Sequence, residues 1–204
     1  MKDLGKLRVI IGNTNFYQSE ITNLGELQVI VGDVEFIDSK VVDLGKLEII
    51  GGSVWFSYSE ITSLGQLRII GRDAYLTDSK VMDLGNLEVI EGNACFGILL
   101  AEAFRGSIVE NLGNLKIIKG NADFSFSKVE DFSVLQKIGG NLYLENSEVI
   151  CLGQLEIVGG DVDFVESKVK DLGNLKIIGG NVLWNDYLSL QYKKLKGDKN
   201  IHRR

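Results

Sequence analysis

The chain has 204 residues, of which 45% are hydrophobic and 25% charged, and its formal net charge is −6 at pH 7. This apolar content suffices for a buried core, yet no apolar run approaches the ~20 residues that span a bilayer, so we expect no membrane-spanning helix and no membrane partner. The only histidine is His202, which excludes His-based catalytic triads and multi-histidine metal sites. There is no P-loop, no G-x-G-x-x-G after a strand and no C-x-x-C, and we expect no cofactor and no metal.

The charge is unevenly distributed along the chain. From Asn185 to Arg204 there are six Lys or Arg and two Asp, so this segment carries +4 and the preceding residues carry −10. An acidic body repels phosphate backbones, which disfavours nucleic acid as a partner. Cys95 and Cys151 are too few for a disulfide framework, and no signal-peptide pattern opens the chain. We therefore expect two reduced thiols and a cytoplasmic protein.

A repeat organises the chain almost from end to end. Its copies start at residues 3, 23, 43, 63, 83, 111, 131, 151 and 171, so they are 20 residues apart except for one step of 28. A fixed period of this length predicts a solenoid, in which each unit buries its apolar residues against its neighbours. We divide the chain into a solenoid over residues 1–184 and a C-terminal cap with a basic tail over residues 185–204. Repeat positions are numbered below from the first residue of each copy.

Apolar residues recur at fixed positions of the repeat. Position 5 is always Leu, position 8 is Ile except at Val158, position 2 is Leu except at Phe132, and position 14 is aromatic or Leu. Because this spacing is not helical, it predicts short parallel strands whose stacked side chains form a continuous core. Gly at positions 3 and 10 and Asx at position 11 indicate turns.

Two further columns are predicted to be structural. Position 17 is Ser in all eight complete copies, and we expect each hydroxyl to bond the backbone of a turn rather than to act as a nucleophile. Position 18 alternates mostly between Glu and Lys, so neighbouring coils place opposite charges side by side at the ~4.8 Å strand spacing. This alternation disfavours a stacking that is shifted by one coil.

Positions 5 to 19 together read L-x-x-I-x-G-x-V-x-F-x-x-S-x-V. This motif resembles the leucine-rich repeat, with Ser in place of that family's Asn, and the 20-residue length is similar to its short bacterial repeats. It is also reminiscent of viral repeat proteins and of receptor L domains. The resemblance covers residues 3–184 and implies a parallel strand at positions 12 to 14. The expected fold is an all-β solenoid of nine coils of about 20 residues, either leucine-rich-repeat-like or a right-handed parallel β-solenoid, with a C-terminal cap.

Positions 13 and 15 are predicted to point away from the core on the strand face. Trp55 and Tyr75 would then stack in adjacent coils with Tyr58 nearby, which is how a protein interface or a sugar-stacking platform begins. Ordinary cross-strand packing is the alternative. Asp163 and Glu145 would be diagonal neighbours at ~7 Å, in the range of inverting glycosidases, but no catalytic residues are assigned. The strand-face candidates for binding are Glu35, Trp55, Tyr58, Tyr75, Asp123, Tyr143, Glu145 and Asp163.

The step of 28 residues reflects an apolar insertion in coil five, GILLAEAFRG from Gly97 to Gly106. Insertions in repeat proteins emerge as loops, often on the binding face. The alternative is a lid that packs on its own coil. The insertion-loop candidates for binding are Ile98, Leu99, Leu100, Phe104 and Arg105.

The two ends of the solenoid differ. After Trp184 the period fails, and a partly helical pattern predicts a short cap over coil nine. At the other end no cap precedes coil one, so its edge with Leu4, Leu7 and Ile10 could form a homodimer, unless the polar Asn13 to Asn15 suffice as a cap. The sequence thus predicts a non-enzymatic protein-interaction module. The alternatives are a carbohydrate-binding or carbohydrate-cleaving solenoid and a self-associating structural protein.

Overall fold

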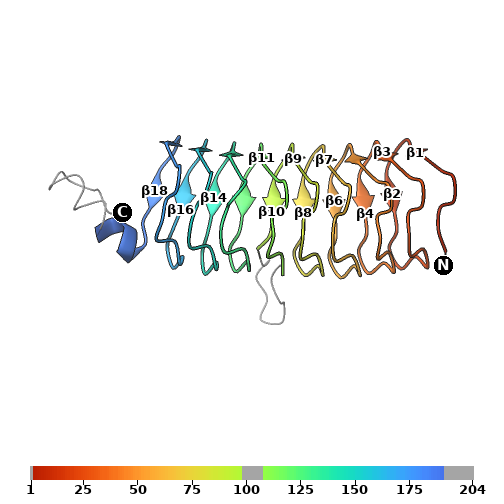
Figure 1. Cartoon of the computed structure of the whole chain (residues 1–204), viewed down its shortest axis with the longest axis horizontal. Coiled ribbons are helices and arrows are strands. Elements are labelled where there is room, and N and C mark those ends of the chain that lie inside the picture. Colours follow the sequence, from red (N-terminus) through yellow and green to blue (C-terminus); the bar gives the residue numbers. More distant parts are fainter. Residues whose placement is uncertain (1, 98–107, 191–204) are drawn as a thin grey trace.

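The computed structural model describes residues 2–97 and 108–190, which form a parallel β-solenoid with an almost straight long axis (Figure 1). Each repeat contributes two strands of two residues, one at positions 7 and 8 and one at positions 12 and 13, and stacking generates two nine-stranded parallel sheets. The first sheet contains β1 (Val9–Ile10), β3 (Val29–Ile30), β5 (Ile49–Ile50), β7 (Ile69–Ile70), β9 (Val89–Ile90), β11 (Ile117–Ile118), β13 (Lys137–Ile138), β15 (Ile157–Val158) and β17 (Ile177–Ile178).

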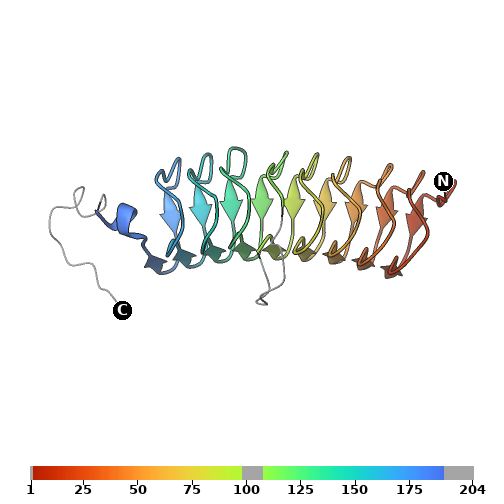
Figure 2. The same ribbon diagram turned by 90° about the horizontal axis from the view of Figure 1, so that it is seen from below.

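The second sheet lies at an angle to the first along the same axis (Figure 2). It contains β2 (Thr14–Asn15), β4 (Val34–Glu35), β6 (Val54–Trp55), β8 (Ala74–Tyr75), β10 (Ala94–Cys95), β12 (Ala122–Asp123), β14 (Leu142–Tyr143), β16 (Val162–Asp163) and β18 (Val182–Leu183). Isolated parallel bridges at position 1, such as Asp3 to Asn23, define a third side of each coil. The predicted strand at positions 12 to 14 is therefore two residues long, and a second strand per coil accompanies it.

The repeated apolar columns form the core. From coil two to coil eight the side chains at positions 2, 5, 8, 12, 14 and 19 are all buried, whereas Ile21 at position 19 of coil one is partly buried. Equivalent phenyl rings stack between coils, with centroids 5.1 Å apart for Phe16 and Phe36 and 4.4 Å apart for Phe96 and Phe124. The latter pair spans the 28-residue step, so the insertion does not change the strand register. The solenoid prediction is confirmed.

A ladder of side-chain hydrogen bonds runs along position 11. The side-chain oxygen of each residue accepts the backbone N–H of the same position in the next coil, from Asn13 to Asp33 (2.9 Å) through to Asp161 and Asn181 (2.6 Å). Position 10 must be small beside this ladder, since a Cβ at Gly52 would lie 2.3 Å from Oδ1 of Asp33. The one exception at position 10, Arg72, follows the one coil in which the ladder residue is the shorter Ser53.

Left-handed backbone turns the chain at two corners of most coils. Position 3 has positive φ in eight coils, where it is Gly, and a glycine tolerates this conformation without steric cost. At position 16 seven non-glycine residues adopt φ of 49° to 58°, among them Tyr58 and Phe126. A backbone bond from position 17 N–H to the position 14 carbonyl closes this second corner, as from Ser59 to Phe56 at 3.0 Å.

The prediction for the serine column is wrong in four coils. Ser19 and Ser79 accept backbone N–H bonds through Oγ. The hydroxyls of Ser39, Ser59, Ser127 and Ser147 are buried and have no hydrogen-bond partner among the described residues. The backbone bond from position 17 to position 14 already closes the turn, so these four hydroxyls are not needed for it. The charge alternation at position 18 is confirmed by the ion pairs Glu20–Lys40, Glu60–Lys80 and Glu148–Lys168.

The last repeat stops after its second strand, and a helix over residues 186–190 follows. Asn185 joins the two, because its Oδ1 accepts the N–H of Leu188 at 2.8 Å while its Nδ2 donates to the carbonyl of Val169 at 3.0 Å. Leu188 is buried, and Trp184 stacks on Phe164. At the other end β1 and β2 are the outermost strands of the two sheets, and Leu7 is 45% exposed. Within residues 2–97 and 108–190, no helix has the length and apolar character needed to cross a bilayer.

Candidate functional site

The outer face of the second sheet carries an aromatic pair. Trp55 on β6 and Tyr75 on β8 are cross-strand partners, and their rings stack with centroids 5.3 Å apart and planes 9° apart. The predicted stacking is thus confirmed. Both side chains are half-buried, so part of each ring is accessible from solvent. Partial burial, together with Asp73, raises the pKa of the Tyr75 hydroxyl, which keeps it a neutral donor.

Of three other predicted residues, Glu35 and Tyr58 lie near the aromatic pair and Tyr143 does not. Glu35 is the neighbour of Trp55 on β4 and accepts a hydrogen bond from Asn15 Nδ2 at 2.7 Å. Tyr58 lies at the left-handed corner of the same coil as Trp55 and is 50% exposed. Tyr143 is on β14, separated from Tyr75 by β10 and β12, so the structure does not bring it into the aromatic pair. The candidate surface is therefore centred on coils three and four.

The acidic residues of the second sheet have a local structural role. Asp123 accepts the N–H of Ser125 at 2.9 Å, and Asp163 accepts the N–H of Val165 at 2.8 Å. Each carboxylate thereby closes a turn just after its strand, which explains an acid at this position without catalysis. Glu145 is exposed on the neighbouring coil. In the described part of the chain, no group of three or more His, Cys, Asp or Glu side chains is arranged to hold a metal ion.

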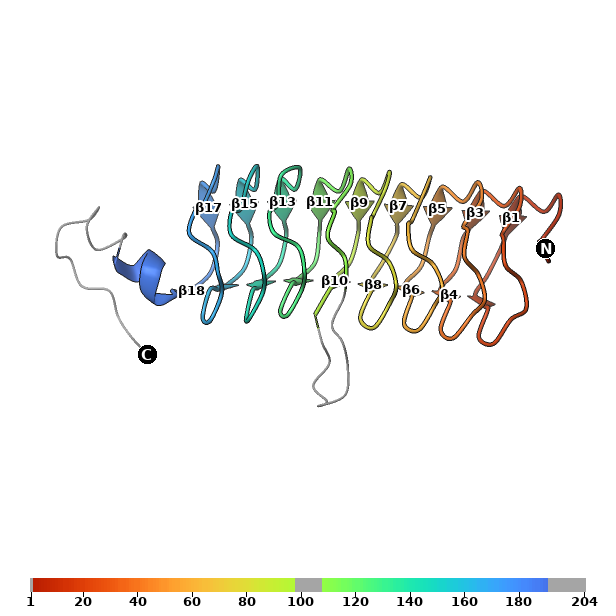
Figure 3. The same cartoon turned by 60° about the horizontal axis from the view of Figure 1, so that its bottom comes forward.

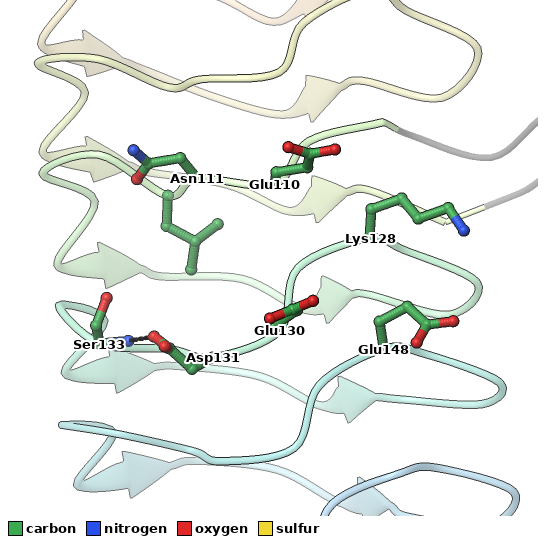
Figure 4. Close-up of a pocket in the computed structure, with 8 residues that line it drawn as sticks. Glu110, Asn111, Lys128, Glu130, Asp131, Ser133 and Glu148 are labelled. Carbon is green, nitrogen blue, oxygen red and sulfur yellow. Dashed lines mark hydrogen bonds between the residues drawn. The ribbon is translucent and has the colours of Figure 1, made fainter.

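A groove on the third side of the solenoid was not predicted (Figure 4). It has a volume of about 760 Å³ and is lined mainly by Glu110, Asn111, Lys128, Glu130, Asp131 and Glu148. Figure 4 shows these side chains along neighbouring coils, with Glu110 and Glu130 between the other residues. Four carboxylates against one lysine make the groove acidic. Lys168 donates to Glu148 and lowers the pKa of that carboxyl, which therefore stays charged at neutral pH.

The groove coincides with a departure from the repeat in coil seven. Positions 2 to 4 read Phe132, Ser133 and Val134 where most other coils have Leu-Gly and a polar residue. Ser133 at position 3 does not adopt the left-handed conformation that the glycines of the other coils have. Phe132 also tilts by 44° against Phe124. The sequence signal that could have located the groove is therefore this F-S-V triplet.

The insertion-loop candidates Ile98, Leu99, Leu100, Phe104 and Arg105 lie outside the described residues. Gly97, directly before them, is buried, and its carbonyl accepts a hydrogen bond from the Thr77 hydroxyl at 2.8 Å. Thr77 also contacts the Cys95 sulfur at 3.4 Å, and burial raises the pKa of that thiol. The segment that leads into the insertion is thus anchored to coil four, next to Tyr75.

Comparison of the chain with protein-family models, with curated proteins and with solved structures found no match.

Proposed function

We propose that the protein is a non-enzymatic binding module that contacts a protein partner through the second sheet, around Trp55 and Tyr75. The observation that carries this proposal is the stacked, partly accessible Trp55–Tyr75 pair on a parallel sheet. Tryptophan and tyrosine are enriched among the residues that dominate binding energy at protein interfaces. A catalytic role has less support, because the acids of the same face close turns.

A rigid scaffold favours this use of the surface. Each strand of coils three and four is hydrogen-bonded on both sides, and the Asx ladder of position 11 ties every coil to the next. A surface that is ordered before binding loses little conformational entropy on association. The insertion of coil five starts beside Tyr75, and we propose that Ile98, Leu99, Leu100, Phe104 and Arg105 extend the same contact surface.

The test is chemical crosslinking in host lysate with the wild type, a Trp55→Ser/Tyr75→Ser variant and a Tyr143→Ser variant. The third chain is a matched control, since Tyr143 is on the same sheet but away from the pair. A discrete crosslinked partner that is lost only in the double variant supports the proposal. Equal recovery with all three chains would place the contact elsewhere. Trimming Gly97–Gly106 to the two residues that other coils have tests the extension separately.

Four further points are also proposals. A glycan ligand is the alternative for the same aromatic pair, and Asp163→Asn/Glu145→Gln tests whether a polysaccharide is cleaved. Self-association through the exposed edge of β1 and β2 is a second alternative, supported by the 45% exposure of Leu7. A cytoplasmic location is supported by two free cysteines. Kinship with leucine-rich repeats is supported by the buried leucines at positions 2 and 5, whereas a second strand in each coil favours a plain β-solenoid.

A further inference from the structure

The outer face of the first sheet is apolar along most of its length. Position 8 of each strand is buried in most coils and points into the core, whereas position 7 is partly or largely exposed and points outward. A sheet with one face in water normally alternates apolar and polar residues, whereas two apolar faces are typical of a sheet covered on both sides. The outward column, which is polar only at Lys137, consists of Val9, Val29, Ile49, Ile69, Val89, Ile117, Lys137, Ile157 and Ile177.

We propose that a second copy of this chain covers this face, with the two solenoids antiparallel. The two-fold axis runs along the strands, between coils four and five. Such an axis sets each repeat position opposite the same position of the other copy and reverses the order of the coils. Coil one then faces coil eight, coil two faces coil seven, coil three faces coil six and coil four faces coil five. Ile69 of one copy meets Val89 of the other at the centre.

The charges at position 6 favour this arrangement. Within one chain Arg68 pairs with Glu88 and Lys176 with Glu156, each at 2.9 Å, so the interface adds contacts to existing ion pairs. The column lies next to the apolar one, and both line one shallow depression around Ile117 and Ile157. From coil one to coil nine it reads Arg8, Gln28, Glu48, Arg68, Glu88, Lys116, Gln136, Glu156 and Lys176.

In the proposed register every pair in this column is complementary or neutral. Arg68 faces Glu88, Glu48 faces Lys116, Arg8 faces Glu156, and the two glutamines face each other. A shift of one coil in either direction destroys the match. One shift sets Arg68 against Lys116 and Glu88 against itself, and the other sets Glu48 against Glu88 and Arg68 against itself. Unfavourable pairing of this kind discriminates strongly between registers.

The size of the residues at position 9 is compatible with the same register. The glycines there also serve the stacking within one chain, because a Cβ at Gly71 would clash with the carbonyl oxygen of Gly51. This position is glycine in coils three, four, seven, eight and nine, and it carries a side chain at Ile11, Val31, Glu91 and Lys119. Ile11 is 86% exposed and Val31 51% exposed. In the proposed register coils one, two, five and six, which have the side chains, face coils eight, seven, four and three, which have glycine. Every protruding residue therefore meets a gap.

The face is large enough for a modest interface. Eight overlapping coils at ~4.8 Å and four residues at ~3.3 Å give a patch of roughly 500 Å² in projection per copy. The accessible area of protruding side chains is larger than their projection, which brings the patch to about the lower end of specific interfaces, ~600 Å² per partner. Strands that keep nearly one direction along the solenoid, as Figure 3 shows, allow the two faces to remain in register over this length. A dimer of moderate affinity is expected.

Sedimentation velocity of the full chain over a concentration series tests the proposal. We expect the wild type to dimerise and Ile69→Lys to weaken the dimer by at least about tenfold, because a lysine at the centre is desolvated without a partner. Ile177→Lys is the matched control. It places the same residue at the same repeat position in coil nine, which faces no coil of the other copy, so dimerisation should be unchanged. Circular dichroism and the melting temperature establish that each variant is folded.

A charge exchange tests the register itself. Glu48→Lys and Lys116→Glu should each weaken the dimer, and the two together in one chain should restore it, because residue 48 of each copy faces residue 116 of the other. A wild type that stays monomeric, equal effects of Ile69→Lys and Ile177→Lys, or no recovery in the double variant would each overturn the proposal. None of these results bears on partner binding at Trp55 and Tyr75, and a dimer through the edge of β1 and β2 would be insensitive to Ile69→Lys.

Discussion

Replacing Asn141 by alanine should weaken the stacking of coils seven and eight by a predictable amount. Its Oδ1 accepts the backbone N–H of Asp161 at 2.8 Å, and its Nδ2 donates to the Tyr143 hydroxyl at 2.8 Å. Alanine leaves that N–H without its acceptor, which costs ~1–3 kcal/mol when the group is buried. Because Asp161 is exposed and water can reach it, we expect about 1–1.5 kcal/mol, the lower part of that range.

Serine at the same position should restore part of the loss, since Ser53 performs this role naturally through a longer bond of 3.3 Å to the Asp73 N–H. Hydrogen exchange of the Asp161 amide measures the effect locally, and alanine should accelerate it by about tenfold, the equivalent of ~1.4 kcal/mol. Asn114→Ala is the control, because Asn114 Nδ2 makes only an exposed side-chain bond to Asn86 at 3.3 Å. Equal exchange in Asn141→Ala and the wild type would refute the role assigned to the ladder.

Three further predictions concern other elements of the coil. Ser53→Asp should destabilise the protein when Arg72 is present but not when it is combined with Arg72→Gly. A double-mutant cycle in urea unfolding should show a coupling energy of about 1 kcal/mol or more between the two substitutions. Additive effects would contradict the steric link between the two positions. Phe126→Asn should stabilise by roughly 1 kcal/mol relative to Phe126→Ala, because asparagine tolerates the φ of 58°; no difference between the two in thermal unfolding would argue against strain at this corner. Burial raises the pKa of the Cys95 thiol, so Cys95 should be alkylated more slowly than free cysteine at the same pH. As the pH rises, the alkylation rate of Cys95 should keep increasing after the rate of free cysteine has levelled off. Equal pH profiles would place the thiol in solvent.

Much of the fold was predictable because the same apolar positions recur nine times. One residue such as Leu67 or Ile70 says little about the fold by itself. The same apolar residue at the same position of nine copies, however, can be buried only if the coils stack on one another. The stacking of Trp55 and Tyr75 follows from the same equivalence of positions.

The outward apolar column of the first sheet was missed for a physical reason. Positions 7 and 8, such as Ile69 and Ile70, are both β-branched, and the pattern does not tell which of them points inward. The groove was missed because it depends on one altered turn at Ser133 rather than on the repeat. The unpaired hydroxyl of Ser59 was missed because the sequence does not distinguish a serine whose hydroxyl forms a hydrogen bond from one whose hydroxyl is left without a partner.

The ion pairs of position 18 have a consequence for how such a chain can grow or shrink. Copies one and three end in S-E-I-T, and copies two and four end in S-K-V-V and S-K-V-M, so the pattern in this half of the chain repeats every 40 residues. Loss or duplication of a single coil would bring Glu next to Glu or Lys next to Lys, whereas loss or duplication of two coils preserves every pair from Glu20–Lys40 to Glu60–Lys80. Gene rearrangements in this half should therefore be tolerated in steps of 120 nucleotides and selected against in steps of 60.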